Sequence, residues 1–176
     1  RIKTERLASL DMEHILAMRY EAEPLNFSGK LRFVSRLRGD VENHTRKTNP
    51  IVDYGPFGRK LDMGKLERDG RFLYYEGTTQ GSRLSVGCGS SHRISAGGYA
   101  APCLVGGETK GLEASCTLEV EAAKGENVVL EKMACYATSL DMEKEALEGF
   151  VRKELERAEA AGYGALKKRQ AEAFAR

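Results

Sequence analysis

The stretch ILAMRYEAEPLNFSGKLRFVSRLR, residues 15–38, contains two runs in which apolar and polar residues alternate. The apolar positions are Leu16, Met18, Tyr20 and Ala22 in the first run, and Leu31, Phe33 and Leu37 in the second. A period of two is typical of a strand with one face in a core and the other in solvent. The two runs are separated by only six residues, 24–29, so we expect them to form an antiparallel β-hairpin.

The second run places four basic residues on one face: Lys30, Arg32, Arg36 and Arg38. Such a row could bind phosphate or nucleic acid. Alternatively, Glu21 and Glu23 of the preceding strand could lie opposite or diagonal to these cations and form weak exposed ion pairs. No aromatic platform is interleaved with the basic residues on this face, as single-stranded nucleic acid would require. We therefore favour the ion-paired surface over an anion site.

The connection between the runs, PLNFSG, has residues that end a strand and form a turn. Pro24 cannot donate to a β-ladder, and Asn26, Ser28 and Gly29 favour turns. We expect Leu25 and Phe27 to anchor the loop on a neighbouring surface. The alternative is that this loop docks on another domain or on a partner subunit.

Strand patterns continue to residue 137. SCTLEVEA, residues 115–122, alternates in the same way, whereas NVVLEKMACYA, residues 127–137, is apolar on both faces and predicts a central strand. RFLYYEG (71–77) and RLSVGCG (83–89) add short strands joined by glycine-containing turns. The aromatic residues of FLYYEG could stack on sugars, although core packing is the simpler interpretation. This pattern indicates an antiparallel β-sandwich or barrel.

VGCGSSHRISAGG, residues 86–98, is rich in glycine and serine. It lacks the GxxxxGK[ST] pattern of a phosphate-binding loop, so we expect a flexible loop. His14, His44 and His92 are single and far apart, which argues against a metal site or a catalytic triad.

From residue 141 the period changes to that of a helix. Asp141 is a plausible N-cap, Glu148 and Arg152 can pair at i,i+4, and Gly162 is placed to end the helix. Leu147, Phe150, Val151, Leu155 and Ala158 form its apolar face. A second helical pattern, with Tyr163, Leu166 and Phe174, follows. We expect residues 1–140 to form the β-sandwich and residues 141–176 a helical linker.

Composition limits the functional classes. With 176 residues, 41% of them hydrophobic, and a net charge of +2, the chain fits one domain with no global field for nucleic acid or membrane. Its four cysteines have no metal-ligand spacing, so we expect buried free thiols. The chain has no apolar run long enough for a membrane span, and it opens with RIKTER, which is not a signal peptide. A cytoplasmic location is the expectation.

LASLDMEHILAMRYEAEPLNFSGKLRFVSRLRGDVEN, residues 7–43, closely resembles the N-terminal region of glycoside hydrolase family 65, the maltose, kojibiose and trehalose phosphorylases. The resemblance weakens through residues 45–110 and returns over the strands and helices of 112–176. It implies a mainly β fold, an antiparallel two-sheet super-sandwich of the galactose-mutarotase-like type, followed by linker helices. It also implies that the sandwich is incomplete at its N-terminus.

The resemblance implies that the chemistry takes place in a separate α/α barrel, which we expect to lie beyond residue 176. There a glutamic acid protonates the glycosidic oxygen while inorganic phosphate attacks the anomeric carbon with inversion. The resemblance thus implies phosphate as the co-substrate of the parent enzyme, with no other cofactor, and an α-linked disaccharide as its substrate. It assigns no catalytic, cofactor-binding or metal-ligating residue to this chain, which we expect to be inactive alone.

Three functional classes follow. The first is a non-catalytic sandwich domain that supports the barrel of the same polypeptide and shapes its sugar entrance. The second is a freestanding carbohydrate-binding module, which would present an exposed aromatic platform on one sheet face. The third is a structural or assembly domain of a homodimer. The first is the prediction that the sequence favours.

Overall fold

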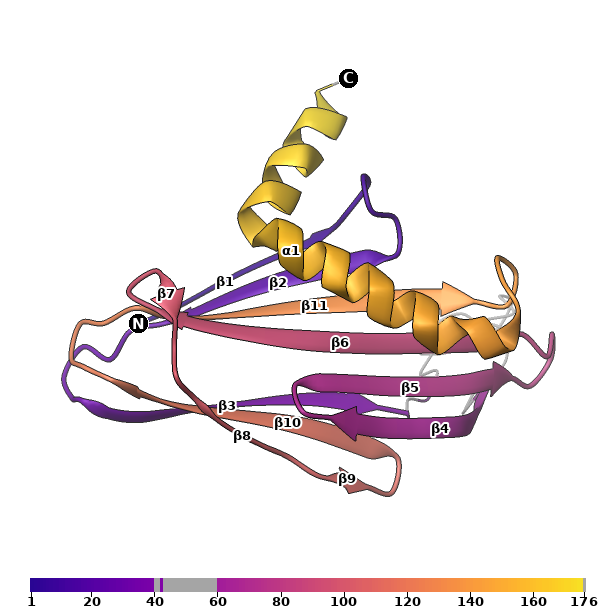
Figure 1. Cartoon of the computed structure of the whole chain (residues 1–176), viewed down its shortest axis with the longest axis horizontal. Coiled ribbons are helices and arrows are strands. Elements are labelled where there is room, and N and C mark those ends of the chain that lie inside the picture. The colour runs from indigo at the N-terminus through magenta and orange to yellow at the C-terminus, as the bar shows by residue number, and fades with distance from the viewer. Residues whose placement is uncertain (40–41, 43–59, 176) are drawn as a thin grey trace, which may run out of the picture.

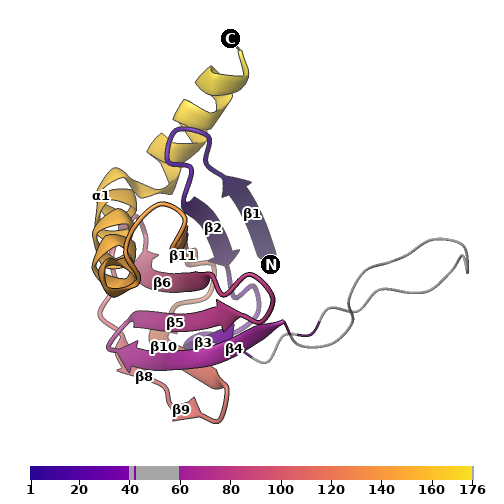
Figure 2. The same ribbon diagram turned by 90° about the vertical axis from the view of Figure 1, so that its right-hand side faces the viewer.

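The computed structural model describes residues 1–39, 42 and 60–175, which form two antiparallel sheets and a C-terminal helix (Figure 1). Sheet A has, in spatial order, β1 (Ile2–Ala8), β2 (Ile15–Ala22), β11 (Val128–Thr138), β6 (Ser85–Ala96), β5 (Phe72–Thr79) and β4 (Leu61–Asp69), with β7 (Tyr99–Ala100) also paired to β6. Sheet B has β3 (Gly29–Arg38), β10 (Glu113–Ala122) and β8 (Leu104–Gly106) in that order, and β9 (Thr109–Lys110) also pairs with β10. Figure 2 shows the two sheets as separate layers. The predicted antiparallel two-sheet sandwich is confirmed.

Alternation along the strands sets which residues enter the core between the sheets. On β10, Cys116, Leu118 and Val120 are buried, while the residues between them face outward. The inner faces of β5, β6 and β11 contribute Leu73, Ile94, Val128 and Leu130 to the same core. The strand at 127–137 is central as predicted, because β11 lies between β2 and β6.

The predicted hairpin of residues 15–38 is wrong, because its two strands belong to different sheets. β2 pairs with β1 and β11 in sheet A, while β3 pairs with β10 in sheet B. The connection at residues 24–28 therefore passes from one layer to the other. The alternation of apolar and polar residues predicts which face of a strand is buried, but not which strand it pairs with. Both strands direct an apolar face toward the same interior, so their patterns look like those of a hairpin.

The predicted flexible loop at residues 86–98 is also wrong. Residues 85–96 form β6, a twelve-residue strand that is buried along most of its length. Its small residues are needed for packing rather than for a turn. A Cβ at Gly89 would collide with Val151 of the helix and would lie 3.2 Å from both Leu155 and Phe72.

Helix α1 (Leu147–Phe174) begins after a 3₁₀ turn, η1 (Lys144–Ala146). Asp141 is not its N-cap as predicted. Ala146 occupies that position without a side-chain cap, and Asp141 instead accepts a hydrogen bond from the Thr138 hydroxyl at 3.3 Å, in the turn after β11. An aspartate that stabilises such a turn has the same sequence signature as a helix cap. The predicted Glu148–Arg152 pair is present at 3.1 Å.

Gly162 was expected to end the helix, but it kinks it. Its φ of 76° and ψ of 159° lie outside the helical region and within reach of glycine alone, and residues 163–174 then continue as helix in a new direction. Figure 1 shows this second part leaving the surface of the sheet toward the C-terminus. Lys167 and Arg169 pair with Glu5 and Asp11 of the β1 region at 2.8 and 3.1 Å.

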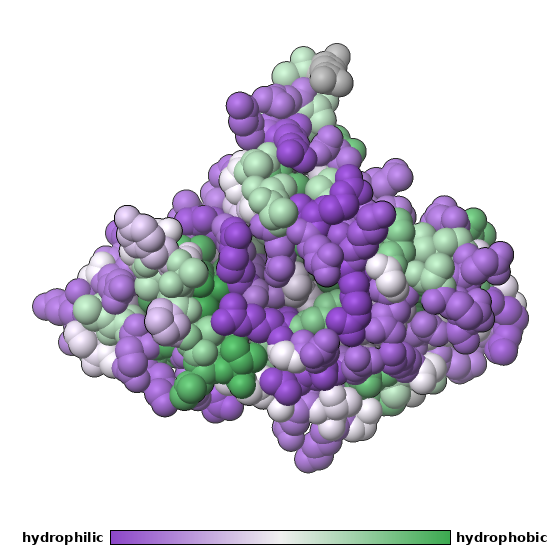
Figure 3. All heavy atoms as spheres, in the orientation of Figure 1, coloured by the Kyte–Doolittle hydropathy of each residue, from purple (hydrophilic) through white to green (hydrophobic). Residues whose placement is uncertain are grey.

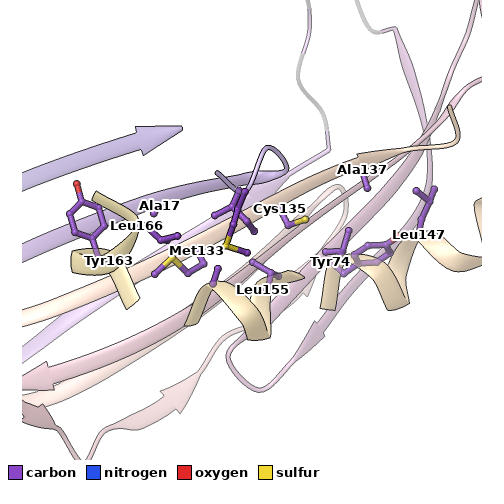
Figure 4. Close-up of a cluster of buried hydrophobic side chains, with 13 residues drawn as sticks. Ala17, Tyr74, Met133, Cys135, Ala137, Leu147, Leu155, Tyr163 and Leu166 are labelled. Carbon is purple, nitrogen blue, oxygen red and sulfur yellow. The ribbon is translucent and has the colours of Figure 1, made fainter. Parts of the chain in front are cut away.

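The first part of α1 and the turn that follows the kink cover the outer face of sheet A. Figure 4 shows Leu147, Leu155, Tyr163 and Leu166 of the helix directed toward strand residues that include Met133, Cys135 and Ala137. All seven side chains are at most 3% exposed. The central strands of sheet A are therefore buried on both faces, by the helix on one side and by sheet B on the other.

The solvent face of the helix is hydrophilic, as Figure 3 shows at the centre of the view, while hydrophobic surface gathers to its left. Over the described residues, no helix combines the length and apolarity that crossing a membrane would need.

We predict that Gly89→Ala lowers the free energy of unfolding by about 1–3 kcal/mol, because the added methyl group must push α1 away from β6. Urea denaturation followed by circular dichroism would measure the change. Gly81→Ala is the matched control, since nothing lies within 4 Å of its Cβ position, and it should leave stability within about 0.5 kcal/mol. Equal effects of the two substitutions would contradict this account of the helix–sheet contact.

Candidate functional site

The basic residues of β3 lie on the outer face of sheet B, where two acids of β10 form ion pairs with them. Lys30 and Arg32 reach Glu119 at 3.0 and 3.6 Å, and Arg36 and Arg38 reach Glu113 at 3.1 and 3.8 Å. The predicted ion-paired surface is thus present, but its acids are not the predicted ones. Glu21 pairs with Arg19 and Lys3 on sheet A, and Glu23 pairs with Arg1 just beyond the ends of β2 and β1. The arginine row is an exposed paired surface.

The PLNFSG loop is held by its backbone and Ser28. Gly125 donates its amide to the Pro24 carbonyl at 2.7 Å, and Lys124 donates its amide to the Ser28 hydroxyl at 2.8 Å. Leu25 and Phe27 are 54% and 48% exposed, so they do not anchor the loop as expected. Their exposure leaves them available to another surface, the alternative use of this loop.

A polar cluster inside the sandwich connects the two sheets. His92 Nδ1 donates to the Arg71 carbonyl at 2.7 Å, which leaves Nε2 to accept from the Ser35 hydroxyl at 2.8 Å. Lys132 Nζ donates to the same hydroxyl at 2.9 Å. Burial lowers the pKa of His92 to about 4, so the ring is neutral near pH 7. The Ser35 side chain from sheet B is therefore tied to two strands of sheet A.

Sequence reasoning found His92 but not its partners. The available signal was Lys132, a lysine within a strand that is apolar on both faces. It shares the parity of Val128 and Leu130, so it had to face the interior. Ser35 gave no signal, because the pairing of the sheets was not known.

A cleft opens beside this cluster. We call it the open cleft: it lies between β1 and β2 of sheet A and β3 of sheet B and has a volume of about 540 Å³. Its apolar wall is made of Met18, Tyr20, Leu31, Phe33 and Leu130. Tyr20 and Phe33 meet edge to face across it, with ring centroids 6.0 Å apart.

The remaining sequence candidates are distributed through the fold. His14 packs edge to face on Phe150 and its Nδ1 is 2.8 Å from the Tyr136 carbonyl, while His44 lies outside the described residues. Tyr74 and Tyr75 of β5 are buried, so this strand serves the core rather than a sugar. All four cysteines are free, and Cys88, Cys116 and Cys135 are buried. Within the part of the chain that the structure describes, no three His, Cys, Asp or Glu residues gather as a metal site would need.

Comparison with known families decides the identity of the fold. The sequence profile described as "Glycosyl hydrolase family 65, N-terminal domain" matches residues 1–176, the whole chain. The chain belongs to this family. The resemblance seen in residues 7–43 therefore extends over all 176 residues of the chain.

Individual relatives agree with this assignment. The domain is 28% identical over 171 residues to an alpha,alpha-trehalose phosphorylase of Thermoanaerobacter brockii, covering 97% of the domain and 22% of that protein. An alpha,alpha-trehalose phosphorylase of Geobacillus stearothermophilus is 31% identical over 94 residues, which are 53% of the domain and 12% of the relative. The domain thus spans less than a quarter of either curated relative.

A solved structure shares the fold. A putative kojibiose phosphorylase from human microbiome superposes with a TM-score of 0.75 at 9% sequence identity, over 98% of the family 65 domain and 21% of that chain. At this identity the likeness shows the fold alone.

We predict that Arg36→Ala in this family 65 domain costs no more than about 1 kcal/mol of stability, because its ion pair with Glu113 is exposed. Leu118→Ala on the neighbouring strand should cost about 2–5 kcal/mol, since Leu118 is fully buried. Urea denaturation would measure both. Sulfate at constant ionic strength should shift the melting temperature of wild type and Arg36→Ala equally. A sulfate-dependent rise confined to wild type would identify an anion site instead.

We predict that His92 makes the domain less stable in mild acid. The folded pKa of about 4 lies below the value of 6.5 for an exposed histidine, so the unfolded chain gains the proton first as the pH falls. The loss begins near pH 6.5, grows down to about pH 4, and reaches about 2 kcal/mol at pH 5. Denaturation of wild type and His92→Gln at pH 7 and pH 5 would measure it. The non-titrating variant should lose less, and identical losses would refute the assignment.

Proposed function

We propose that this chain is the non-catalytic N-terminal sandwich domain of a disaccharide phosphorylase, and that it supports the catalytic barrel of the same polypeptide. The observation that carries the proposal is the match of the whole chain to the family 65 N-terminal domain. The described histidines and cysteines fit this role, because they are dispersed and serve packing and internal hydrogen bonds.

The parent enzyme would cleave an α-linked disaccharide with inorganic phosphate. The curated relatives named for alpha,alpha-trehalose support trehalose as the first substrate to test, and the structural neighbour supports kojibiose as the second. Phosphate is itself a nucleophile, so such an enzyme needs a general acid but no carboxylate to activate water. With inversion, an α-glucoside gives β-glucose 1-phosphate.

Helix α1 supports a role as a connector. Its first part is fixed on sheet A by buried side chains, and its second part leaves the sandwich after Gly162 with Phe174 75% exposed at its end. A helix held in this way sets the direction in which the chain continues. Four unpaired thiols are compatible with the expected cytoplasmic location, and a homodimer of the parent remains part of the proposal.

A freestanding sugar-binding module has less support. Such a module presents neighbouring aromatic rings on one sheet face. The aromatic residues of β5 that the sequence suggested for this purpose are buried, and the outer face of β3 carries paired charges instead.

The test is an assay of the full-length protein that contains this chain. We expect it to release β-glucose 1-phosphate from trehalose, kojibiose or maltose only when inorganic phosphate is present, with the anomer identified by NMR. Residues 1–176 alone should release none. Cleavage without phosphate, no cleavage of any of the three disaccharides, or turnover by residues 1–176 alone would each overturn the proposal.

A further inference from the structure

The two sheets of the sandwich differ in width on the side of the open cleft. Among the described residues, sheet B ends at β3, whose Ser35 lies against β11 and β6 through Lys132 and His92. Sheet A continues past β11 by two more strands, β2 and β1. The inner faces of β2 and β1 therefore extend beyond the edge of sheet B.

The uncovered inner face of β2 is apolar, as the face of a strand in a core would be. Met18 and Tyr20 of β2 are only half-buried, and Leu16 is 43% exposed. Leu31 and Phe33 of β3 are half-buried on the opposite wall. A second hollow, of about 270 Å³, continues along β1 and β2 beside Leu16 and Met18. The apolar surface is thus larger than the described residues cover.

A row of basic residues crosses this face. Arg6 of β1 is the partner of Met18 on β2, Met18 is the partner of Lys132 on β11, and Lys132 is the partner of His92 on β6. Directly opposed residues of antiparallel strands point to the same side of a sheet, so all four face the inside. With His92 neutral, Arg6 and Lys132 carry the positive charge of the row.

No carboxylate of the described residues balances these two cations. The open cleft is lined by Arg6, Lys132, Arg32 and Arg36 and by no aspartate or glutamate among the described residues, and the two arginines of β3 are committed to acids on the outer face. No ion pair joins Arg6 or Lys132 to an acid in the described part of the chain. Burial lowers the pKa of Lys132, as expected for an ammonium group without a counter-charge. Its hydrogen bond to Ser35 uses one of three donors.

β3 also offers a free backbone edge. It pairs with β10 on one side and has no described partner on the other, over ten residues. Such an edge binds another extended chain readily. A strand added there would continue sheet B over β2 and β1, and alternate side chains would enter the open cleft. Apolar side chains would meet Met18 and Tyr20, and an acidic one would reach Lys132.

We propose that an extended segment of the longer polypeptide pairs with the free edge of β3, covers the inner faces of β1 and β2, and binds Lys132 through a carboxylate. The inference rests on the proposed function only in requiring polypeptide outside residues 1–176. The occupant is an acidic extended segment because the cleft is apolar, positively charged and bordered by an unpaired strand. A carboxylate beside Lys132 would offset part of the cost of burying its ammonium group.

The test is zero-length cross-linking of the full-length protein with a water-soluble carbodiimide, which joins a lysine to a carboxylate in contact with it, followed by mass spectrometry. We expect an amide between Lys132 and an aspartate or glutamate outside residues 1–176. Lys30 with Glu119, 3.0 Å apart, and Lys167 with Glu5, 2.8 Å apart, are internal positive controls. A mixture of ¹⁴N- and ¹⁵N-labelled protein separates links within one molecule from links between two.

Three results would overturn the proposal. They are a Lys132 link to an acid within residues 1–176, a link between two copies, and no Lys132 link together with fast hydrogen exchange at alternate amides of β3. The cross-linking assay does not depend on phosphorolysis. The added segment can therefore be refuted while the proposed function holds, and the proposed function can be refuted while the segment is found.

Hydrogen exchange gives a second measurement on the same full-length protein. In a free edge strand every second amide faces away from its partner and exchanges fast. We expect slow exchange at consecutive amides along β3, since both edges would be bonded. Fast exchange at alternate β3 amides would show that its edge is free and would contradict the proposal.

Discussion

The close contact between α1 and β6 is the constraint on which the rest of the structure depends. It exists because β6 presents glycine where the helix lies nearest: Gly89 faces Val151 and Leu155, and Gly87 faces Leu147. With the helix seated there, the central strands of sheet A have no solvent-exposed face over much of their length. The sheet is therefore a middle layer, and its inner face must be covered by sheet B wherever the chain supplies strands. Sheet B covers β5, β6 and β11 but stops short of β2 and β1.

Much of this arrangement follows from the sequence by elementary rules. The alternation in residues 115–122 gives the buried face of β10, and the doubly apolar run at 127–137 gives a strand covered on both sides. What alternation does not encode is the neighbour of each strand. Residues 15–22 and 29–38 have the pattern of a hairpin, yet they enclose the core from opposite sides. The ion pairs of β3 consequently form with β10, which is some 80 residues away in sequence rather than ten.

Small residues caused the other error. Glycine and serine in residues 86–98 are typical of loops when only local conformation is considered. In β6 small residues are required by tertiary packing, because larger side chains would displace the helix. The polar cluster was hidden for a related reason. His92, Lys132 and Ser35 come from three strands, and only the sheet pairing places them together. A lysine within an apolar strand was the one local sign that a charge lies in the interior.

Gly162 makes residues 163–174 a projecting helical arm whose direction depends on the backbone angles of one residue. After the kink, residues 163–174 run for about 18 Å as a helix, with a rise of about 1.5 Å per residue. A rotation of about 10° at this single residue would move the Phe174 end by roughly 3 Å, from that length alone. The start of this arm is buried through Tyr163 and Leu166. Further along, Lys167 and Arg169 attach it to the β1 region only by exposed ion pairs. Exposed ion pairs weaken with salt, so these attachments of residues 163–174 to the β1 region become weaker as the ionic strength rises.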